Sequence, residues 1–308
     1  MDIDELLDLE CRFDFVVQGE EIGRRLDHAL AERAAWASRT TISRWVAEGR
    51  FEVAGRREPR PGRKLRAGER VVGSVPKNPR DLEHPCEDLL SMPIVDRGPG
   101  FAVFDKPSGI SAHPVGGEIK RTLLVMASLI LPGEFEVGGP WLPHRLDRDT
   151  SGLIVVTLTP EARQRFVGAF KARRIRRLYR ARTGPWPEPK GLAEDDGWLT
   201  IRAPIWSPRR PLGRVQIRPD GLDAETRVRL LERFEDRSEV AIEPITGRSH
   251  QIRAHLAHIG APILGDPWYG DLGHRAPRLC LHATGLEIPG DVAGDGRDRH
   301  LTAADLPF

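Results

Sequence analysis

Apolar residues along the chain form short runs and alternating stretches that predict strands, with stretches of helical spacing between them. Residues 153–158, Leu-Ile-Val-Val-Thr-Leu, are rich in β-branched side chains and predict a buried strand. Residues 160–170 and 249–259 carry apolar positions three or four apart, which is typical of helices. Further strands are predicted at residues 94–95, 101–104, 199–206, 226–234, 240–245 and 279–283. Strands in runs, with fewer interspersed helices, favour an α+β fold around a largely antiparallel sheet.

The first quarter of the chain has a different pattern. Residues 24–35 and 38–49 carry apolar positions at helical spacing and predict two helices, the second capped by Ser38. Residues 50–53 and 65–72 predict a hairpin. When the apolar residues of the second helix turn inward, its arginines are left for solvent or for phosphate.

Proline and glycine mark the boundaries between these regions. Residues 76–93 contain several prolines and lack periodicity, which predicts a linker, and residues 289–308 are rich in glycine and aspartate, which predicts a poorly ordered tail. The predicted organisation is an acidic N-terminal segment (1–19), a basic module (20–75), the linker (76–93), a larger domain (94–288) and the tail (289–308).

Composition narrows the class of protein. Hydrophobic residues make up 39% of the 308 residues and charged residues 30%, the profile of a soluble globular protein. No stretch has the apolar length of a membrane span, and the acidic start does not resemble a signal peptide, so we expect a cytoplasmic protein. The three cysteines are far apart and lack the spacing of a zinc site or a disulfide framework.

Charge is distributed unevenly. Residues 20–80 contain 15 Lys and Arg against 8 Asp and Glu, whereas residues 1–19 contain one Arg against six acids. A basic module of this kind is typical of a protein that binds a polyanion, although a solvated surface is the commoner meaning of charge alone. Contacts from Arg and Lys to phosphate give affinity and register, so we expect this module to dock a polyanion and not to select a base.

A cluster of charges directly precedes the strand at residues 153–158. Residues 144–149, His-Arg-Leu-Asp-Arg-Asp, place two carboxylates and two guanidiniums against a strand expected in the core. Charges at such a position indicate a functional site, and the alternative is a solvated loop whose charges pair with one another.

The order of these residues carries a resemblance to a known family. Residues 144–153, His-Arg-Leu-Asp-Arg-Asp-Thr-Ser-Gly-Leu, are similar to the active-site motif of the RluA-like pseudouridine synthases. Other segments resemble that family in type and order, and the resemblance covers about residues 101–286. These segments are residues 104–109 with 112–114, 178–181, and 246–253 with 265–270. The basic module resembles the S4-like RNA-binding domain, in residues 23–27, 38–39 and 49–55.

This resemblance implies a mixed sheet split by a cleft that holds RNA, and the isomerisation of uridine to pseudouridine. No redox change occurs and no group is imported, so no cofactor is expected. Asp147 carries over as the catalytic carboxylate, which can attack C1′, remove a C2′ proton or stabilise an oxocarbenium-like centre. Arg248 carries over as the guanidinium that ion-pairs with Asp147 and fixes its direction. Tyr179 carries over as a side chain that stacks on the target base, where it can also help to remove the C5 proton.

Basic side chains are the expected contacts to RNA. Arg145 carries over as a residue that fills the space of the extruded base or holds a phosphate. Seven basic residues between Lys171 and Arg182 surround Tyr179, as expected for a nucleic-acid backbone, or for a solvated strand edge. The other predicted RNA contacts are Arg24, Arg25, Arg39, Arg44, Arg50, Arg176 and Arg177.

Two alternatives accompany this interpretation. A zinc site at His250, His255 and His258 is disfavoured because their spacing is not that of a complete ligand set. A non-catalytic RNA-binding or ribosome-assembly factor on the same fold is disfavoured because Asp147, Tyr179 and Arg248 are all present. We expect a monomer acting on RNA, with large-subunit ribosomal RNA favoured over transfer RNA by the S4-like module.

Overall fold

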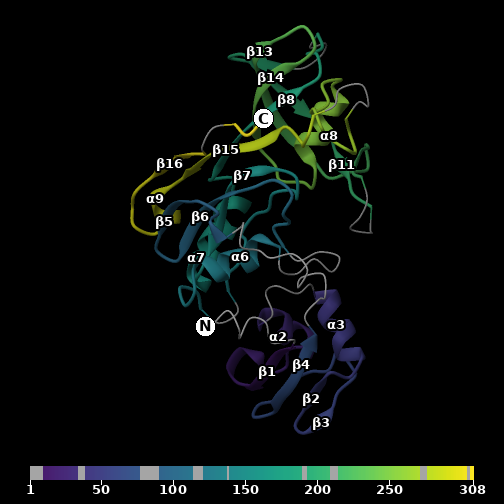
Figure 1. Cartoon of the computed structure of the whole chain (residues 1–308), viewed down its shortest axis with the longest axis vertical. Coiled ribbons are helices and arrows are strands. Elements are labelled where there is room, and N and C mark those ends of the chain that lie inside the picture. The colour runs from purple at the N-terminus through teal and green to yellow at the C-terminus, as the bar shows by residue number, and fades with distance from the viewer. Residues whose placement is uncertain are drawn as a thin grey trace. The chain divides into compact units, whose positions relative to one another are not determined.

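The computed structural model divides the chain into two compact units (Figure 1). The first unit comprises Met1–Ser91 and His113–Trp141, and the second comprises Met92–Ala112 and Leu142–Phe308. None of the helices in the described part of the chain combines the length and the apolar character needed to cross a bilayer. The residues described are 10–33, 39–76, 90–113, 121–136, 139–188, 193–208, 214–270, 276–303 and 306–308.

The first unit contains a four-stranded antiparallel sheet in the order β1-β4-β2-β3. Helices α2 and α3 bury the apolar positions that the sequence pattern turns inward, including Leu30 and Trp45. Its elements are β1 (Glu10–Val16), the short helix η1 (Gly19–Glu21), α2 (Leu26–Arg33), α3 (Arg39–Ala47), β2 (Phe51–Val53), β3 (Arg56–Arg57), β4 (Arg70–Pro76) and α6 (Leu123–Ile130).

Two features of this unit differ from the sequence prediction. Strand β1 lies in the segment expected to precede the domain, yet it pairs with β4 along its whole length, so the sheet includes residues before 20. Strand β2 pairs with β4, which confirms the predicted pairing of residues 50–53 at residues 71 and 72. Its tight hairpin is made instead with β3, through Ala54 (φ 53) and Gly55 (φ 72). Two positive φ angles make a tight two-residue turn, which explains why the partner comes so early in the chain. The predicted cap Ser38 and most of the predicted linker lie outside the described residues.

The second unit contains a ten-stranded mixed sheet, as predicted. Its main path is β5-β6-β7-β15-β8-β14-β13-β10-β9, and β16 pairs with β15. All neighbours are antiparallel except β7 and β15, which are parallel. The elements are β5 (Ile94–Gly98), β6 (Phe101–Lys106), β7 (Ser151–Thr157), α7 (Pro160–Lys171), β8 (Arg176–Thr183), β9 (Ala193–Asp195), β10 (Trp198–Arg202), β11 (Ile205–Trp206), β12 (Gln216–Ile217), β13 (Glu225–Arg233), β14 (Ser238–Pro244), α8 (Gln251–His258), β15 (Leu281–Ile288), α9 (Gly290–Ala293) and β16 (Arg299–Thr302).

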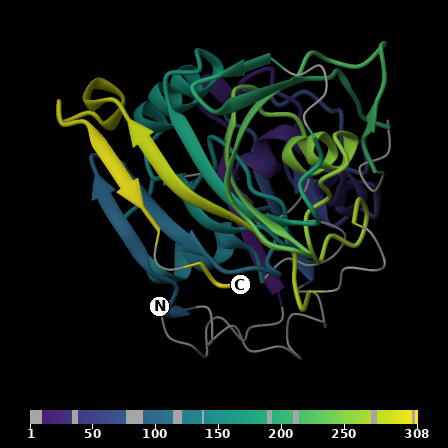
Figure 2. The same cartoon turned by 90° about the horizontal axis from the view of Figure 1, so that it is seen from above.

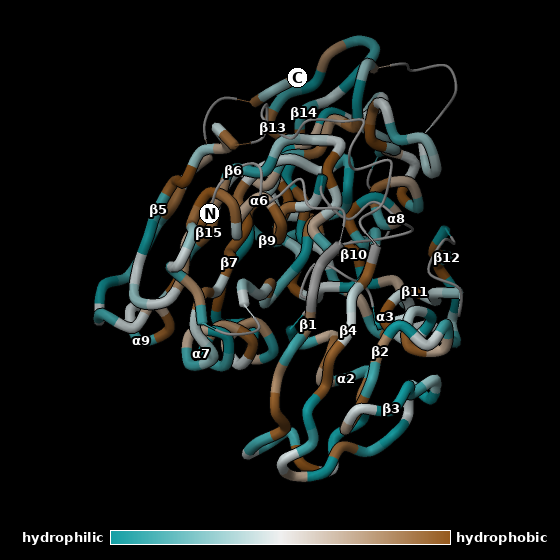
Figure 3. Tube along the Cα trace, turned by 60° about the horizontal axis from the view of Figure 1, so that its bottom comes forward, coloured by the Kyte–Doolittle hydropathy of each residue, from teal (hydrophilic) through white to brown (hydrophobic). Residues whose placement is uncertain are grey.

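Strand β7 is the predicted central strand, and all seven of its residues are buried. Figure 3 shows it as a brown, hydrophobic stretch of the tube. It pairs with β15 only at Ser151 and Gly152. Gly152 has a φ of 107°, and a Cβ at this position would lie 2.2 Å from the carbonyl oxygen of Ala283. Glycine is therefore required where these two backbones approach. Beyond this point the two strands no longer pair with each other.

The predicted helices of the second unit are confirmed. Helix α7 begins at a Thr159 cap whose hydroxyl accepts the Ala162 backbone N–H. Helix α8 ends before Gly260, which has the positive φ expected of a residue past a helix end.

The predicted disorder of residues 289–308 is wrong in the described part of that segment, since it contains α9 and β16. Figure 2 shows β16 beside β15, with β5 close by. Arg299 of β16 also ion-pairs with Asp96 of β5 at 2.8 Å.

Candidate active site

A cavity of about 460 Å³ opens in the second unit, beside the loop that leads into β7. Most of its lining comes from residues 143–147 of that loop, from Arg177 and Tyr179 on β8, and from residues 244–253 at the start of α8. Its volume lies in the range of small-molecule sites. Segments that are about a hundred positions apart in the sequence therefore meet at one cavity, as the motif order predicts.

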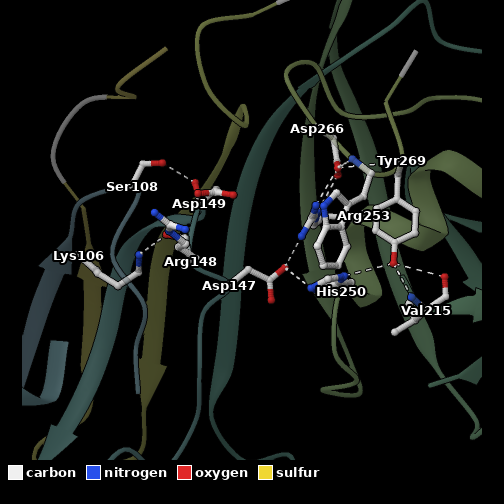
Figure 4. Close-up of polar contacts among 11 residues, drawn as sticks. Lys106, Ser108, Asp147, Arg148, Asp149, Val215, His250, Arg253, Asp266 and Tyr269 are labelled. Atoms are coloured by element: carbon white, nitrogen blue, oxygen red, sulfur yellow. Dashed lines mark hydrogen bonds and ion pairs between the residues drawn. The ribbon is translucent and has the colours of Figure 1, made fainter. Parts of the chain in front are cut away.

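Asp147 lies in this lining, with its side chain 17% exposed. Its Oδ2 accepts a hydrogen bond of 3.1 Å from Nη1 of Arg253 (Figure 4). Nε2 of His250 lies 4.0 Å from the same oxygen. The carboxylate is thus held by one guanidinium and still borders the cavity.

Arg253 is itself fixed by a second carboxylate. Its Nε and Nη2 donate to the two oxygens of Asp266, both at 2.7 Å, and the two side chains are 5% and 0% exposed. Asp266 also accepts the backbone N–H groups of Trp268 and Tyr269. Burial would raise the pKa of Asp266, but the bonded guanidinium holds that pKa below its usual value. Burial would likewise lower the pKa of Arg253, and its hydrogen bonds to Asp266 and Asp147 raise it instead.

The predicted ion pair between Arg248 and Asp147 is wrong. Arg248 lines the cavity, but its Nε donates to the carbonyl oxygen of Asp223 at 3.0 Å. It belongs to the turn before α8, where its backbone N–H bonds the side chain of Gln251. Arg253, in the first part of α8, takes the position beside the carboxylate. The sequence does carry a signal for this, since Arg253 lies between Ile252 and Ala254 on a helix, and a cation buried there requires a charged partner.

Lys106 holds the other side of the loop that carries Asp147. It is a fully buried residue to which the sequence analysis assigned no role. Its Nζ donates to the carbonyl oxygens of Pro107, Ile110 and Arg148, at 2.8 to 3.0 Å. Burial lowers the pKa of Lys106 to about 7, against the attraction of Asp149 and Asp147. Three carbonyl acceptors match the three donors of the protonated amine.

A second set of bonds ties this loop to residues 108–109. The Ser108 hydroxyl donates to the Asp149 carbonyl at 2.7 Å (Figure 4). Arg148 and Gly109 exchange two bonds of 3.0 Å. The residues that flank Asp147 are thus fixed by backbone acceptors, while its own side chain is fixed by Arg253.

His144 has a structural position in the cavity wall. Its Nε2 accepts the backbone N–H of Val155 at 2.9 Å, on β7 where β15 no longer pairs with that strand. Burial lowers the pKa of His144 to about 3, so the ring is neutral. It also packs 4.5 Å from the ring of Phe170.

Tyr179 presents its ring to the cavity from β8. It is 6% exposed and lines the same space as Asp147. Burial raises the pKa of Tyr179 above 10, with the Arg177 charge opposing that shift. A hydroxyl with a raised pKa is less readily ionised at neutral pH, so little of the phenolate that could act as a base is present, and this environment favours stacking over proton transfer.

Comparison with known proteins identifies the family of this chain. Residues 100–258 match the family model described as RNA pseudouridylate synthase. The chain belongs to this family. It is 37% identical over 290 residues to an uncharacterized RNA pseudouridine synthase of Chloroflexus aurantiacus, covering 92% of this chain and 87% of that protein. It is 32% identical over 307 residues to the ribosomal large subunit pseudouridine synthase D of Yersinia pestis, covering 94% and 91%.

Solved structures of the same class share the fold. Human RNA Pseudouridylate Synthase Domain Containing 1 is 26% identical and superposes with a TM-score of 0.56, over 70% of this chain and 84% of that one. The protein is therefore an isomerase of the pseudouridine synthase class, and the predicted fold class is confirmed.

The arginines predicted to contact RNA in this synthase have different surroundings. Arg145 lines the cavity, is exposed, and has no hydrogen bond or ion pair within the described residues. Arg177 lines the cavity too, and Nη2 donates to the carbonyl oxygens of Pro244 and Thr246. Arg176 points elsewhere, because side chains alternate along β8, and it pairs with Glu243 and Glu287. Arg145 is therefore the most available cation of the three.

The predicted RNA-binding arginines of the first unit also divide into two groups. Arg24, Arg25 and Arg50 form ion pairs of 2.7 to 3.2 Å with nearby acids, and Arg44 lies 3.9 Å from Glu48. Arg39, at the start of α3, is exposed and has no partner within the described residues. An ion-paired arginine must exchange its partner to reach a phosphate, so Arg39 is the most available of this set.

Two of the three histidines considered for zinc, His250 and His255, have other partners. His255 is fully buried, and its two ring nitrogens bond Thr226 and the carbonyl of Ala203. Nδ1 of His250 lies 3.2 Å from the Tyr269 hydroxyl, which also accepts the Val215 N–H. In the described part of the chain, no three potential metal ligands come together.

Proposed function

We propose that this synthase isomerises uridine to pseudouridine with Asp147 as its active-site carboxylate. The observation that carries the proposal is the 3.1 Å contact between Asp147 and Arg253 in the wall of the cavity. A carboxylate in the wall of a cavity needs a bonded cation to fix the direction in which it points. Arg253 supplies that cation, and Asp266 prevents it from turning away.

The reaction breaks the bond between ribose C1′ and uracil N1, turns the base, and joins C1′ to C5. Attack on C1′, removal of a C2′ proton and stabilisation of an oxocarbenium-like centre all require an ionised carboxylate beside the sugar. Tyr179, which borders the same cavity, supplies an aromatic surface for the extruded base. Arg145 supplies an unpaired guanidinium for the space that the base leaves, or for a phosphate.

Large-subunit ribosomal RNA is the substrate class that we favour. Support comes from the relatives, since those of Yersinia pestis and Xanthomonas campestris are named ribosomal large subunit pseudouridine synthase D. The first unit adds a basic surface, on which Arg39 is free to bind phosphate. In this proposal that unit docks the RNA, and the cavity of the second unit takes the uridine.

The experiment is to map pseudouridine in cellular RNA with and without the gene. We expect one or more sites in large-subunit ribosomal RNA to lose the modification on deletion. A plasmid encoding the wild-type chain should restore them, and one encoding Asp147→Asn should not. Loss of sites only in transfer RNA would contradict the proposed substrate. Restoration by Asp147→Asn would contradict the proposed carboxylate.

A further inference from the structure

Trp268 is the one aromatic residue among those described that is both large and exposed. It is 41% exposed, whereas every other exposed large hydrophobic residue of the described chain is aliphatic. Leaving an indole in water forgoes a large burial energy, so a fixed and exposed tryptophan is unusual unless it meets a partner.

The backbone that carries Trp268 is fixed by hydrogen bonds. Its own N–H donates to Oδ1 of Asp266 at 2.9 Å, and the N–H of Gly270 donates to the Asp266 carbonyl at 3.0 Å. Gly265 opens this loop with a φ of 71°, and a Cβ there would lie 1.9 Å from the Arg278 carbonyl oxygen. The loop therefore has little freedom to move the indole.

Trp268 also contacts two residues of the cavity wall. Its ring lies 4.9 Å from the ring of His250, edge to face, and 5.7 Å from the guanidinium carbon of Arg253. Both residues line the cavity and approach Asp147. The indole thus packs against two residues of the cavity wall, and it does not itself line the cavity.

We propose that Trp268 stacks on an unpaired RNA base that flanks the target uridine. This inference rests on the proposed function, in which the uridine leaves its stack to enter the cavity. Extrusion of one nucleotide deprives its neighbours of a stacking partner, and an aromatic side chain can replace it. The unpaired Arg145 of the same lining favours a polyanion at this place over an apolar protein surface. Trp268 is then a positioning residue for RNA and not a catalytic one.

The test measures the affinity of the full-length chain for single-stranded oligouridylate, which reports binding without any need for turnover. We expect Trp268→Leu to weaken binding about tenfold, within the range of a base stacked on an aromatic side chain, and Trp268→Phe to retain most of the affinity. Trp198→Leu is the matched control, because Trp198 packs against Arg227 and Arg229 on β13 and lines no cavity described here. It should bind as the wild type does.

A second probe tests whether the contact is made to a base. The probe is an oligoribonucleotide of the same length that lacks the base at every position. Wild type and Trp268→Leu should bind this probe with equal affinity. Turnover on ribosomal RNA should show a raised KM for Trp268→Leu with little change in kcat.

Several results would overturn the proposal: no binding of oligouridylate by the wild type, equal affinity of wild type and Trp268→Leu, equal loss in Trp268→Phe and Trp268→Leu, or a difference that persists with the abasic probe. Failure of the proposed function would appear separately, as turnover by Asp147→Asn, and would leave these affinities unchanged.

Discussion

Two arginine–carboxylate pairs in the second unit have nearly the same length but differ in the exposure of the arginine. Arg253 and Asp266 meet at 2.7 Å and are 5% and 0% exposed, whereas Arg176 meets Glu243 at 2.8 Å with side chains that are 48% and 8% exposed. Water can replace the partner of the exposed arginine but not of the buried one. Removing one member of a buried pair costs about 3–5 kcal/mol, and an exposed pair contributes about 0–1 kcal/mol. Burial, and not the distance between the charged atoms, therefore decides which pair contributes more to the free energy of unfolding.

The buried pair is also the one connected to the cavity. Arg253 uses Nε and Nη2 for Asp266 and keeps Nη1 for Asp147. The donors of Arg176 instead bond Glu243 and Glu287. The density of arginines along the sequence therefore does not identify the functional one.

The largest effect is expected from Arg253→Met. It leaves Asp266 buried without its partner, so the free energy of unfolding should fall by about 3–5 kcal/mol. Pseudouridine formation by the remaining folded protein should fall at least about a hundredfold, because Asp147 loses both its direction and its counter-charge. Denaturant unfolding and single-turnover assays measure the two quantities. Arg176→Met is the matched control, and similar losses in both variants would contradict the comparison.

Asp266→Asn should come next, with an effect that depends on pH. The folded-state pKa of Asp266 is lowered, so its stabilising contribution is complete above the unfolded value of about 4 and is lost as pH falls through the folded value. At neutral pH we expect a loss of about 3 kcal/mol in the free energy of unfolding. The difference in the free energy of unfolding between wild type and Asp266→Asn should narrow as the pH is lowered from about 5 to about 3. A gap that is constant or that widens in acid would contradict the role of the ionised Asp266.

Arg248→Gln should have a moderate effect on activity and almost none on stability. The side chain is exposed and bonds one carbonyl oxygen, so the free energy of unfolding should change by no more than about 0.5 kcal/mol. Turnover should fall about tenfold at most, because Arg248 lines the cavity without fixing Asp147. A loss as great as that of Arg253→Met would restore Arg248 as the partner of Asp147.

The smallest effect is expected from Arg176→Gln. Its guanidinium is half-exposed and Arg227 also lies 3.7 Å from the buried Glu243, so the ion pairs of Arg176 with Glu243 and Glu287 should contribute at most about 1 kcal/mol to the free energy of unfolding. RNA affinity should fall less than in Arg145→Gln, since Arg145 is unpaired and lines the cavity. Titration of RNA with Arg176→Gln and with Arg145→Gln, followed by gel shift or fluorescence anisotropy, shows which variant binds more weakly. Greater weakening by Arg176→Gln would show that RNA contacts the opposite face of β8.

The sequence predicts the parts of the fold that depend on local pattern. The apolar run of β7, the Thr159 cap of α7 and the helix at Gln251–His258 all appear as expected. The pattern fails for β1 and β16, which are short strands whose pairing depends on distant partners, β4 and β15. An acidic or glycine-rich composition does not reveal such a partner.

The same limit applies to the site. Asp147 and Tyr179 border one cavity, as the motif order predicts. The choice between Arg248 and Arg253 depends on where a helix begins: five positions separate the two, and Arg248 precedes the first turn of α8. Lys106 could not be assigned either, because its three acceptors are backbone carbonyls, which are the same in every sequence.

The most direct measurement compares wild type with Asp147→Asn in the same RNA, for both turnover and affinity. The amide keeps the shape of the carboxylate and removes its charge, so we predict no detectable pseudouridine and an affinity within about twofold of the wild type. Turnover at the wild-type rate by Asp147→Asn would contradict the account, whatever its affinity for RNA.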